Sequence, residues 1–294
     1  MLSIDGGGMR LANLWPSLQK TAENWVAHDA PRLGAALAFY TILSMSPLVL
    51  LAVAIAALVF DRTSAQNELL YQVQGMVGDQ GRQLVEGILE SARQPASGIF
   101  ASTVSVLTLL FGASGVFSEL RAALNRIAGS GNDQTMSFYR MVRESLFSFG
   151  MVLAIGFLLM VTLVFSATLA AIGSFWGTAL PVPAGVLEVF NFLISFASIA
   201  GLFALMFRYI PDETVPWRDV VAGSVVTALL FTLGKTLIGL YLGKASVGSA
   251  YGAAGSLMVL TVWVYYSAQI FFFGAEFTHV WARVRREEEE GALS

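Results

Sequence analysis

The stretch YGAAGSLMVLTVWVYYSAQIFFFGAEF, residues 251–277, decides the fold class of this chain. It overlaps a run of 31 residues without Asp, Glu, Lys or Arg that lies between Lys244 and Glu276. About 20 apolar residues in a helix cross the hydrocarbon core of a bilayer, and a charge at the bilayer centre costs at least about 2.5–3.5 kcal/mol. The stretch therefore predicts a transmembrane helix over residues 253–277.

Uncharged runs of similar length predict further spans. The chain is 56% hydrophobic and 13% charged, whereas soluble domains average about 45–50% and 25%. A run of 43 uncharged residues between Glu144 and Glu188 is divided by Pro181 and Pro183, because proline breaks a helix. The sequence thus predicts an all-α polytopic membrane bundle with about six transmembrane helices. The other expected spans are 34–60, 98–118, 145–173, 184–207 and 220–242.

Residues 61–93 join the first two expected spans and have a pattern of their own. Apolar residues recur at helical spacing before Gly78 and after Gly81, which predicts a short outer helical pair divided at these glycines. The pair either lies over the outer mouth of the bundle or on the membrane surface, or it packs on the bundle as a simple cap.

The ends of the chain differ from the apolar middle. Residues 1–14 are expected to be a disordered leader and residues 15–281 one membrane domain. Residues 282–294 form a charged tail, in which the run of Arg followed by Glu is typical of a solvated helix end.

Lys and Arg are distributed unevenly between the two sides of the expected bundle. Twelve lie at the termini and in the loops on the same side, four lie on the other side, and Lys235 lies within a span. Positively charged segments near span ends stay in the cytoplasm. The sequence therefore predicts a multi-pass protein of the bacterial inner (plasma) membrane with cytoplasmic N and C termini.

Composition argues against several classes of function. The chain has no cysteine, only two histidines and a formal net charge of −3, so we expect no metal site, no cofactor and no nucleic-acid partner. The opening DGGGMR, residues 5–10, is similar to a lipase oxyanion loop, but no G-x-S-x-G nucleophile motif follows. We expect no catalytic residue and no enzyme activity.

Polar residues inside the first span form one candidate feature. Tyr40, Ser44 and Pro47 are spaced i, i+4 and i+7 and so share a helix face. In lipid such a face turns toward other helices or a wet cavity, and Pro47 is expected to kink the helix. The face has two readings, contact between helices or the lining of a substrate path.

Lys235 is the most unusual residue of the expected spans, because it lies well inside the fifth. It either snorkels to the interface, forms an ion pair or binds substrate. Glu188 is the expected acidic partner by depth, with carbonyl groups near residues 181–183 as the alternative. Glu276, at the inner end of the sixth span near His279 and Arg283, fits an ordinary interfacial group.

Four segments together carry a resemblance to a known family. They are PRLGAALAFYTILSMSPLVLL from Pro31, LFGASGVFSELRAALNRI from Leu110, FRYIPDETVPWRDVVAGSVVTALLFTLGKTLIGLYLG from Phe207 and YGAAGSLMVLTVWVYYSAQIFFFGAEF from Tyr251. The chain resembles the YihY/BrkB family of bacterial inner-membrane proteins, whose members have also been labelled ribonuclease BN, from about residue 15 to 281. The resemblance implies six helices with cytoplasmic ends and carries over no catalytic residue. The polar family positions present here are Arg32, Tyr40, Ser44, Asn125, Arg208, Tyr209, Trp217, Lys235, Tyr251, Tyr265 and Glu276.

These observations favour a transporter or a lipid-handling protein with a polar cavity between its helices. Its partners would be membrane lipids and a lipid-linked or small amphipathic substrate. The alternative is a non-transporting envelope-integrity or virulence-associated scaffold. A ribonuclease is disfavoured because the carboxylates are scattered between opposite membrane faces. The candidate residues of a substrate path are Arg32, Tyr40, Ser44, Pro47, Asn125, Glu188, Lys235, Tyr251 and Glu276.

Overall fold

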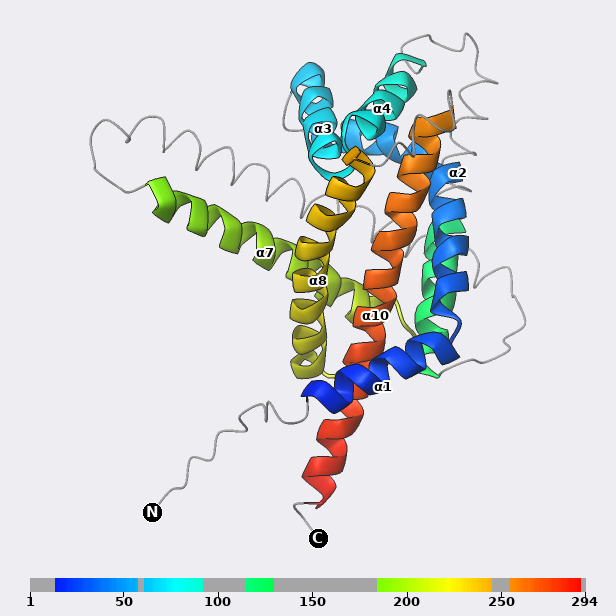
Figure 1. Cartoon of the computed structure of the whole chain (residues 1–294), viewed down its shortest axis with the longest axis vertical. Helices are drawn as coiled ribbons and strands as arrows, with labels where there is room; N and C mark the ends of the chain where they lie inside the picture. Colours follow the sequence, from blue (N-terminus) through cyan, green and yellow to red (C-terminus); the bar gives the residue numbers. More distant parts are fainter. Residues whose placement is uncertain (1–13, 58–60, 92–114, 130–183, 245–253, 292–294) are drawn as a thin grey trace.

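The computed structural model describes residues 14–57, 61–91, 115–129, 184–244 and 254–291, and every regular element in these ranges is a helix. The prediction of an all-α membrane bundle is confirmed. Residues 115–128 form a helix that is drawn in green in Figure 1. The labelled helices are α1 (Leu14–Ala27), α2 (Ala30–Ala56), α3 (Arg62–Val77), α4 (Asp79–Ser91), α7 (Ala184–Tyr209), α8 (Trp217–Lys244) and α10 (Gly255–Gly291).

Three of these helices are long and apolar enough to cross a membrane: α8, α10 and the Phe192–Tyr209 part of α7. Helix α2 is a fourth if its two parts, Ala30–Ser46 and Leu48–Ala54, count as one span bent by 57°. The bend falls at Pro47, as expected of a residue that removes a helical hydrogen bond and clashes with the preceding turn. The expected span 145–173, and nearly all of 98–118, lie outside the described residues.

Helices α8 and α10 lie side by side and run in opposite directions (Figure 1). Their contact is built from glycines: a Cβ placed on Gly223 would lie 1.8 Å from Thr278 Oγ1, and one placed on Gly274 would lie 1.8 Å from Thr227 Oγ1. Each threonine donates its hydroxyl to the glycine carbonyl on its own helix, at 2.7 Å for Thr227 and 2.8 Å for Thr278. We call these four residues the glycine–threonine seam. It brings the two backbones close, as small residues do between membrane helices.

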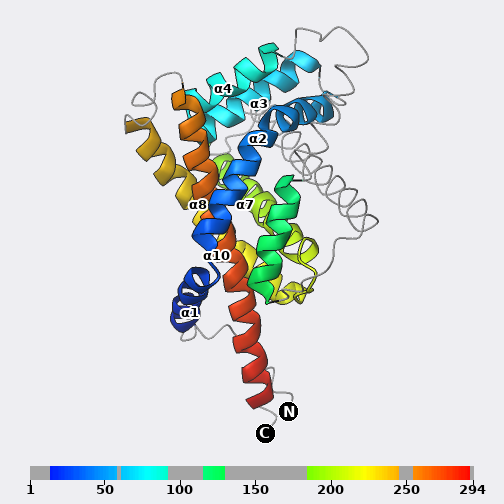
Figure 2. The same cartoon turned by 90° about the vertical axis from the view of Figure 1, so that its right-hand side faces the viewer.

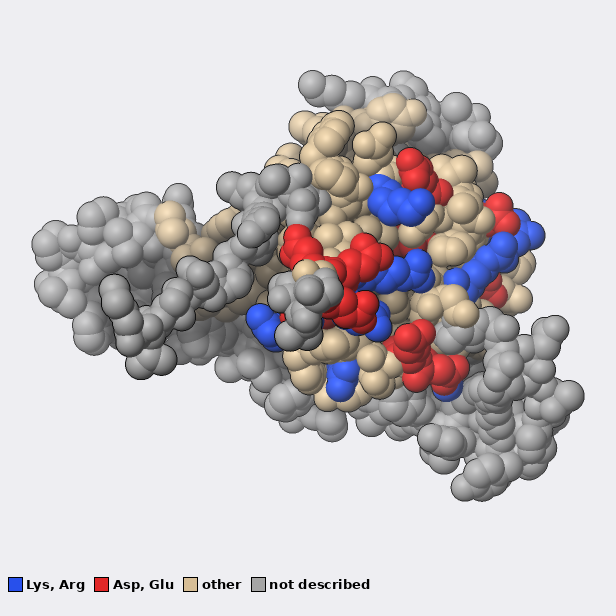
Figure 3. All heavy atoms as spheres, turned by 90° about the horizontal axis from the view of Figure 1, so that it is seen from below, with Lys and Arg blue, Asp and Glu red and all other residues tan. Residues whose placement is uncertain are grey.

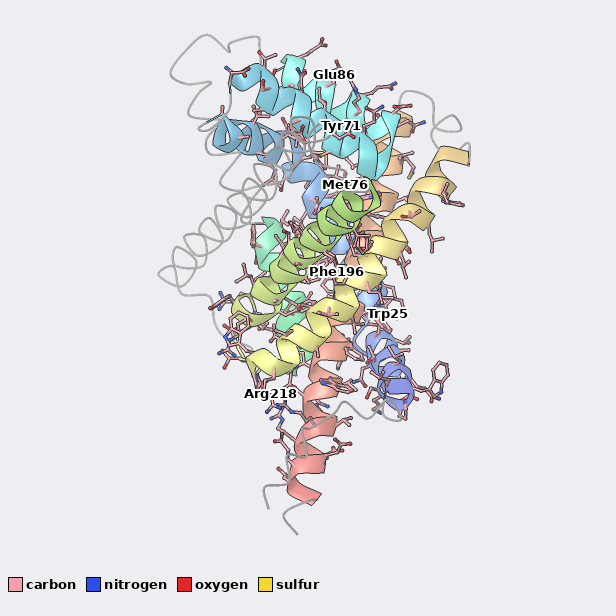
Figure 4. All side chains as sticks on the ribbon, turned by 90° about the vertical axis from the view of Figure 1, so that its left-hand side faces the viewer. Trp25, Tyr71, Met76, Glu86, Phe196 and Arg218 are labelled. Carbon is pink, nitrogen blue, oxygen red and sulfur yellow. The ribbon has the colours of Figure 1, made fainter. Side chains whose placement is uncertain are left out.

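Aromatic residues join α7 to this pair. The Phe203 ring lies 5.7 Å from that of Phe231 on α8 and 5.9 Å from that of Phe271 on α10, measured between ring centroids. Phe207, one turn further along α7, lies 5.0 Å from Phe271. Offset and edge-to-face aromatic pairs of this kind stabilise a core beyond the area they bury. Phe196, labelled in Figure 4, packs at the edge of the same core.

Helices α3 and α4 confirm the predicted short pair, and they pack on one end of the bundle. Gly78 divides them with a positive φ of 84°, a conformation that glycine adopts without steric cost. Val77 is buried with Ile238 of α8 and with Val259 and Leu260 of α10. The pair is therefore a cap, and Figure 4 shows Tyr71 and Glu86 on it.

The two ends of the bundle differ in character. Helix α1 crosses α10 at the end opposite α3 and α4, and α10 continues past it to Gly291 (Figures 1 and 2). The charged segment after 282 is thus helical through 291, which agrees with the predicted helix end. We call this end, where the described N- and C-terminal residues lie, the terminal end, and the end covered by α3 and α4 the capped end.

Candidate functional site

The most unusual polar group in the described residues is Glu276 of α10. Its side chain is only 1% exposed, and its Oε1 atom lies 2.5 Å from Nδ1 of His28. His28 is 31% exposed and occupies the two-residue turn between α1 and α2. The ring nitrogen and the carboxylate oxygen are within hydrogen-bond distance of each other. The pair therefore connects a group inside the bundle to the surface of the terminal end.

The turn that presents His28 depends on Asp29. Asp29 has a φ of 57°, a left-handed conformation that Asp tolerates better than most residues. The last turn of α1 closes with His28 N donating to Asn24 O at 2.8 Å, and α2 begins with Arg32 N donating to Asp29 O at 2.9 Å. The chain therefore changes direction within two residues, which fixes His28 beside α10.

Asp29 also ties this turn to the helix 115–128. Its Oδ2 atom accepts hydrogen bonds from Arg126 Nη2 at 3.0 Å and from Arg32 Nη2 at 3.2 Å. Arg32, one of the predicted path residues, is therefore held by an exposed acid at the surface of the terminal end. Exposed pairs of this kind contribute about 0–1 kcal/mol each.

Asn125, another predicted path residue, links the helix 115–128 to the α7–α8 connection by hydrogen bonds. Its Nδ2 atom donates to Asp212 Oδ2 at 2.5 Å, and its Oδ1 accepts from the backbone N of Asp212 at 2.8 Å. Arg121, one turn earlier, also pairs with Asp212. Asp212 lies between α7 and α8, so these contacts fix the α7–α8 connection to the helix 115–128.

A second buried carboxylate, Asp219, was not predicted from the sequence. It lies in the first turn of α8, its side chain is fully buried, and its Oδ2 accepts from Arg285 Nη2 of α10 at 3.0 Å. The positive end of the α8 dipole and the guanidinium both stabilise its charge. The available signal was the position of Asp219 two residues after Trp217, where an apolar span begins.

Together these contacts form a closed ring of links at the terminal end, which we call the polar circuit. The α1–α2 turn is linked to 115–128, that helix to the α7–α8 connection, and α8 to α10; Glu276 and His28 close the ring. Figure 3, viewed from this end, shows basic and acidic side chains lying next to one another. The members are His28, Asp29, Arg121, Asn125, Arg126, Asp212, Asp219, Glu276 and Arg285.

The other predicted path residues do not join this ring. Ser44 is buried and donates its hydroxyl to Tyr40 O at 2.8 Å, so its part of the predicted inward face is confirmed. Tyr40 is 38% exposed. A Cβ placed on Gly115 would lie 3.2 Å from its ring, so the ring packs along the helix 115–128. The side chain of Pro47 lies outside the described residues.

Lys235 is half-buried and lies four residues after Phe231, on the flank of α8 that faces α7. The start of α7, which carries Glu188, diverges from α8 in Figure 1. The side chain of Glu188 and all of Tyr251 lie outside the described residues, so pairing between Lys235 and Glu188 stays a prediction. Among the described residues, no three His, Asp or Glu side chains gather as a metal site would require.

The apolar spans and the helical architecture define a multi-pass membrane protein. The chain matches the virulence factor BrkB family over residues 21–294 and belongs to it. The resemblance predicted from the four sequence segments is thereby confirmed.

Several bacterial membrane proteins are similar over most of the chain. The UPF0761 membrane protein YihY of Escherichia fergusonii is 31% identical over 72% of this chain and 70% of its own length. A UPF0761 membrane protein of Enterobacter sp. (strain 638) is 30% identical over 71% and 68%. One of Verminephrobacter eiseniae is 28% identical over 90% of this chain, which spans only 62% of that relative. These names describe membrane proteins and no enzyme activity. No solved structure matches the chain.

Proposed function

We propose that this chain is a transporter or lipid-handling protein of the bacterial inner membrane, with the terminal end in the cytoplasm. The observation that carries the proposal is Glu276, a carboxylate buried within a membrane helix and bound to His28. Ionisable residues inside membrane bundles are expensive and typically belong to substrate, ion or proton pathways. A carboxylate and an imidazole within hydrogen-bond distance of each other are groups of the kind from which such pathways are made.

A purely structural contact would not need this chemistry. Apolar residues of similar volume often replace a buried ion pair without loss of stability. The glycine–threonine seam and the phenylalanine contacts already hold α7, α8 and α10 together without charges. Glu276 and His28 therefore have a role that packing alone does not require, and we assign it to movement of a proton or a charged substrate group.

An amphipathic or lipid-linked substrate fits the surface of α2. Tyr40 lies at the edge of the bundle beside Phe39 and Leu43, which are both exposed apolar residues. A polar group beside lipid-facing side chains suits a substrate with a polar head and an apolar tail. In this proposal, the head contacts Tyr40 and the tail stays in lipid.

The orientation rests on charge. The predicted topology places twelve of the seventeen Lys and Arg residues on the side of the termini, and such segments remain cytoplasmic. In this orientation, the polar circuit faces the cytoplasm and the α3–α4 cap faces the periplasm.

The test is reconstitution of the full chain into liposomes, with assays for lipid scrambling and for flux of small polar and amphipathic compounds. We expect activity that falls at least about tenfold in Glu276→Gln and His28→Gln, as for loss of a proton-transfer group. Glu23→Gln is the matched control, because Glu23 is an exposed acid of α1 that pairs with its neighbour Lys20. Neither scrambling nor flux in the wild type would favour the scaffold alternative. If Glu276→Gln and His28→Gln were as active as the control Glu23→Gln, Glu276 would have no part in the activity.

A further inference from the structure

Helix α1 has three distinct faces. Ser17 and Thr21, both buried, face the protein. Lys20 and Glu23 are exposed and pair with each other at 3.3 Å. A third face carries apolar residues spaced three, four and four apart, and successive residues of a helix are rotated by about 100°. This apolar stripe consists of Trp15, Leu18, Ala22 and Val26.

The apolar stripe points away from the protein. Trp15 is 74% exposed and Val26 is 65% exposed, Ala22 is also exposed, and Leu18 is half-buried. An amphipathic helix on a water-soluble protein buries its apolar face against the core and leaves polar residues outside. Helix α1 does the reverse, because it buries two hydroxyl side chains and exposes the stripe. An environment other than water must therefore cover the stripe.

The position of α1 identifies that environment. The helix ends two residues before α2, which begins at Ala30 and exposes Phe39 and Leu43 as a membrane-spanning helix does. Figure 1 shows α1 lying across α10 rather than along it. A helix joined so directly to the start of a span lies at the depth of the lipid headgroups. Trp25, labelled in Figure 4, packs against the core and holds α1 at this level.

We infer that α1 is an in-plane helix of the membrane interface, with Trp15, Leu18, Ala22 and Val26 inserted among the lipid acyl chains at the terminal end. Tryptophan is favoured at this depth, and helices with one apolar and one charged face bury the apolar face at the boundary between headgroups and acyl chains. Lys20, on the charged face, lies where it attracts an anionic headgroup. The inference does not depend on transport activity.

The absence of cysteine makes this placement directly testable. Single cysteines at Ala22, Val26, Lys20 and Glu23 of the full chain receive a nitroxide label, and the protein is reconstituted into phosphatidylethanolamine–phosphatidylglycerol liposomes. Collision rates are measured with oxygen, which concentrates in lipid, and with a water-soluble nickel chelate. Leu237→Cys is the reference for a lipid-facing position, because Leu237 is an exposed apolar residue within the membrane-spanning part of α8. Two stripe positions give independent readings if one variant does not fold.

We expect labels at positions 22 and 26 to resemble the label at position 237, with high oxygen and low nickel collision rates. Labels at positions 20 and 23 should collide with nickel at a rate at least about threefold higher. Nickel access at 22 and 26 equal to that at 23 would place the stripe in water and overturn the inference. If both reagents were excluded from the labels at 22 and 26 and the spectra showed spin–spin broadening, a second copy of the chain would cover the stripe. If both were excluded without broadening, the stripe would be buried within the chain. Both results would also overturn it.

Discussion

Thr278 of α10 occupies the space where Gly223 of α8 lacks a side chain, and Thr227 of α8 occupies the corresponding space at Gly274 of α10. The arrangement is reciprocal because the helices are antiparallel and both pairs are four residues apart. Each threonine hydroxyl bonds to its own helix, so no polar group is left unsatisfied at the closest approach.

Alanine at either glycine should destabilise the protein. The new methyl group of Gly223→Ala would meet Thr278 Oγ1 at 1.8 Å and the Thr278 backbone at 3.1 Å, so the helices must move apart. Overpacking of this kind costs about 1–3 kcal/mol, more than the helix propensity that alanine gains. The measurement is the melting temperature of the purified protein in detergent, which should fall for Gly223→Ala and Gly274→Ala.

Gly239→Ala is the control on the same helix. No described atom lies within 4 Å of the Cβ it would add, so this variant should be neutral or stabilised by up to about 1 kcal/mol. Equal melting temperatures for Gly223→Ala and Gly239→Ala would contradict the close packing of α8 and α10 at the glycine–threonine seam.

Loss of the arginine that pairs with Asp219 should also lower stability. Arg285→Gln leaves a buried carboxylate without its cation, and we expect a loss of about 1.5–3 kcal/mol. Arg286→Gln is the matched control, because its Nε donates to the carbonyl of Ala282 at 3.2 Å rather than to a buried acid. Chemical unfolding in mixed micelles compares the two. The double variant Arg285→Gln, Asp219→Asn should regain part of the stability that Arg285→Gln loses. If it does not, loss of the Arg285–Asp219 pair is not the cause of the lower stability.

The start of α3 should weaken in acid. Asp61 caps the helix by accepting from Ser64 N at 2.9 Å and from Ser64 Oγ at 2.6 Å, and these hydrogen bonds lower the pKa of the Asp61 carboxyl below its usual value of 3.8. A carboxyl with a lowered pKa stabilises the fold above its unfolded value and loses this effect as pH falls through the folded value. Hydrogen exchange at residues 64–66 should therefore accelerate below about pH 4 relative to Asp61→Asn, after correction for intrinsic rates.

The proposed orientation predicts the behaviour of reporter fusions. Alkaline phosphatase is active only in the periplasm, so a fusion within the α3–α4 connection at Gly78 should be active and one after Arg286 inactive. The physical reason is the excess of Lys and Arg at the terminal end. Green fluorescent protein fused after Arg286 should be fluorescent, as expected for a cytoplasmic position. An active phosphatase at 286 would reverse the proposed topology.

Local signals in the sequence predicted every labelled helix except α1. Uncharged runs located α2, α7, α8 and α10, Pro47 marked the bend in α2, and Gly78 marked the boundary between α3 and α4. Each of these features depends on residues close together in the chain, where helix geometry decides what is compatible.

The contacts of the candidate site were much less predictable. Glu276 is among the candidate path residues, but the sequence favoured an ordinary interfacial group, whereas the structure buries it against His28, 248 positions away in the sequence. The sequence did not single out Asp219, because carboxylates are common at the ends of spans. Its burial depends on how the other helices pack around it. Such pairs depend on which helices pack together and in what rotation, and neither follows from the periodicity of one helix. Asn125 stays a predicted path residue, and nothing in the sequence indicated its hydrogen bonds with Asp212.

The glycine–threonine seam has a mechanical consequence. Two helices whose backbones lie this close cannot slide or separate without losing the contacts between them. We therefore expect α8 and α10 to move together as one rigid pair. By contrast, the contacts between the α1–α2 turn and the helix 115–128 include the exposed pair of Asp29 and Arg126, a link that water readily replaces. The contact between α8 and α10 is therefore the stronger of the two, and the surface contact between Asp29 and Arg126 is the weaker.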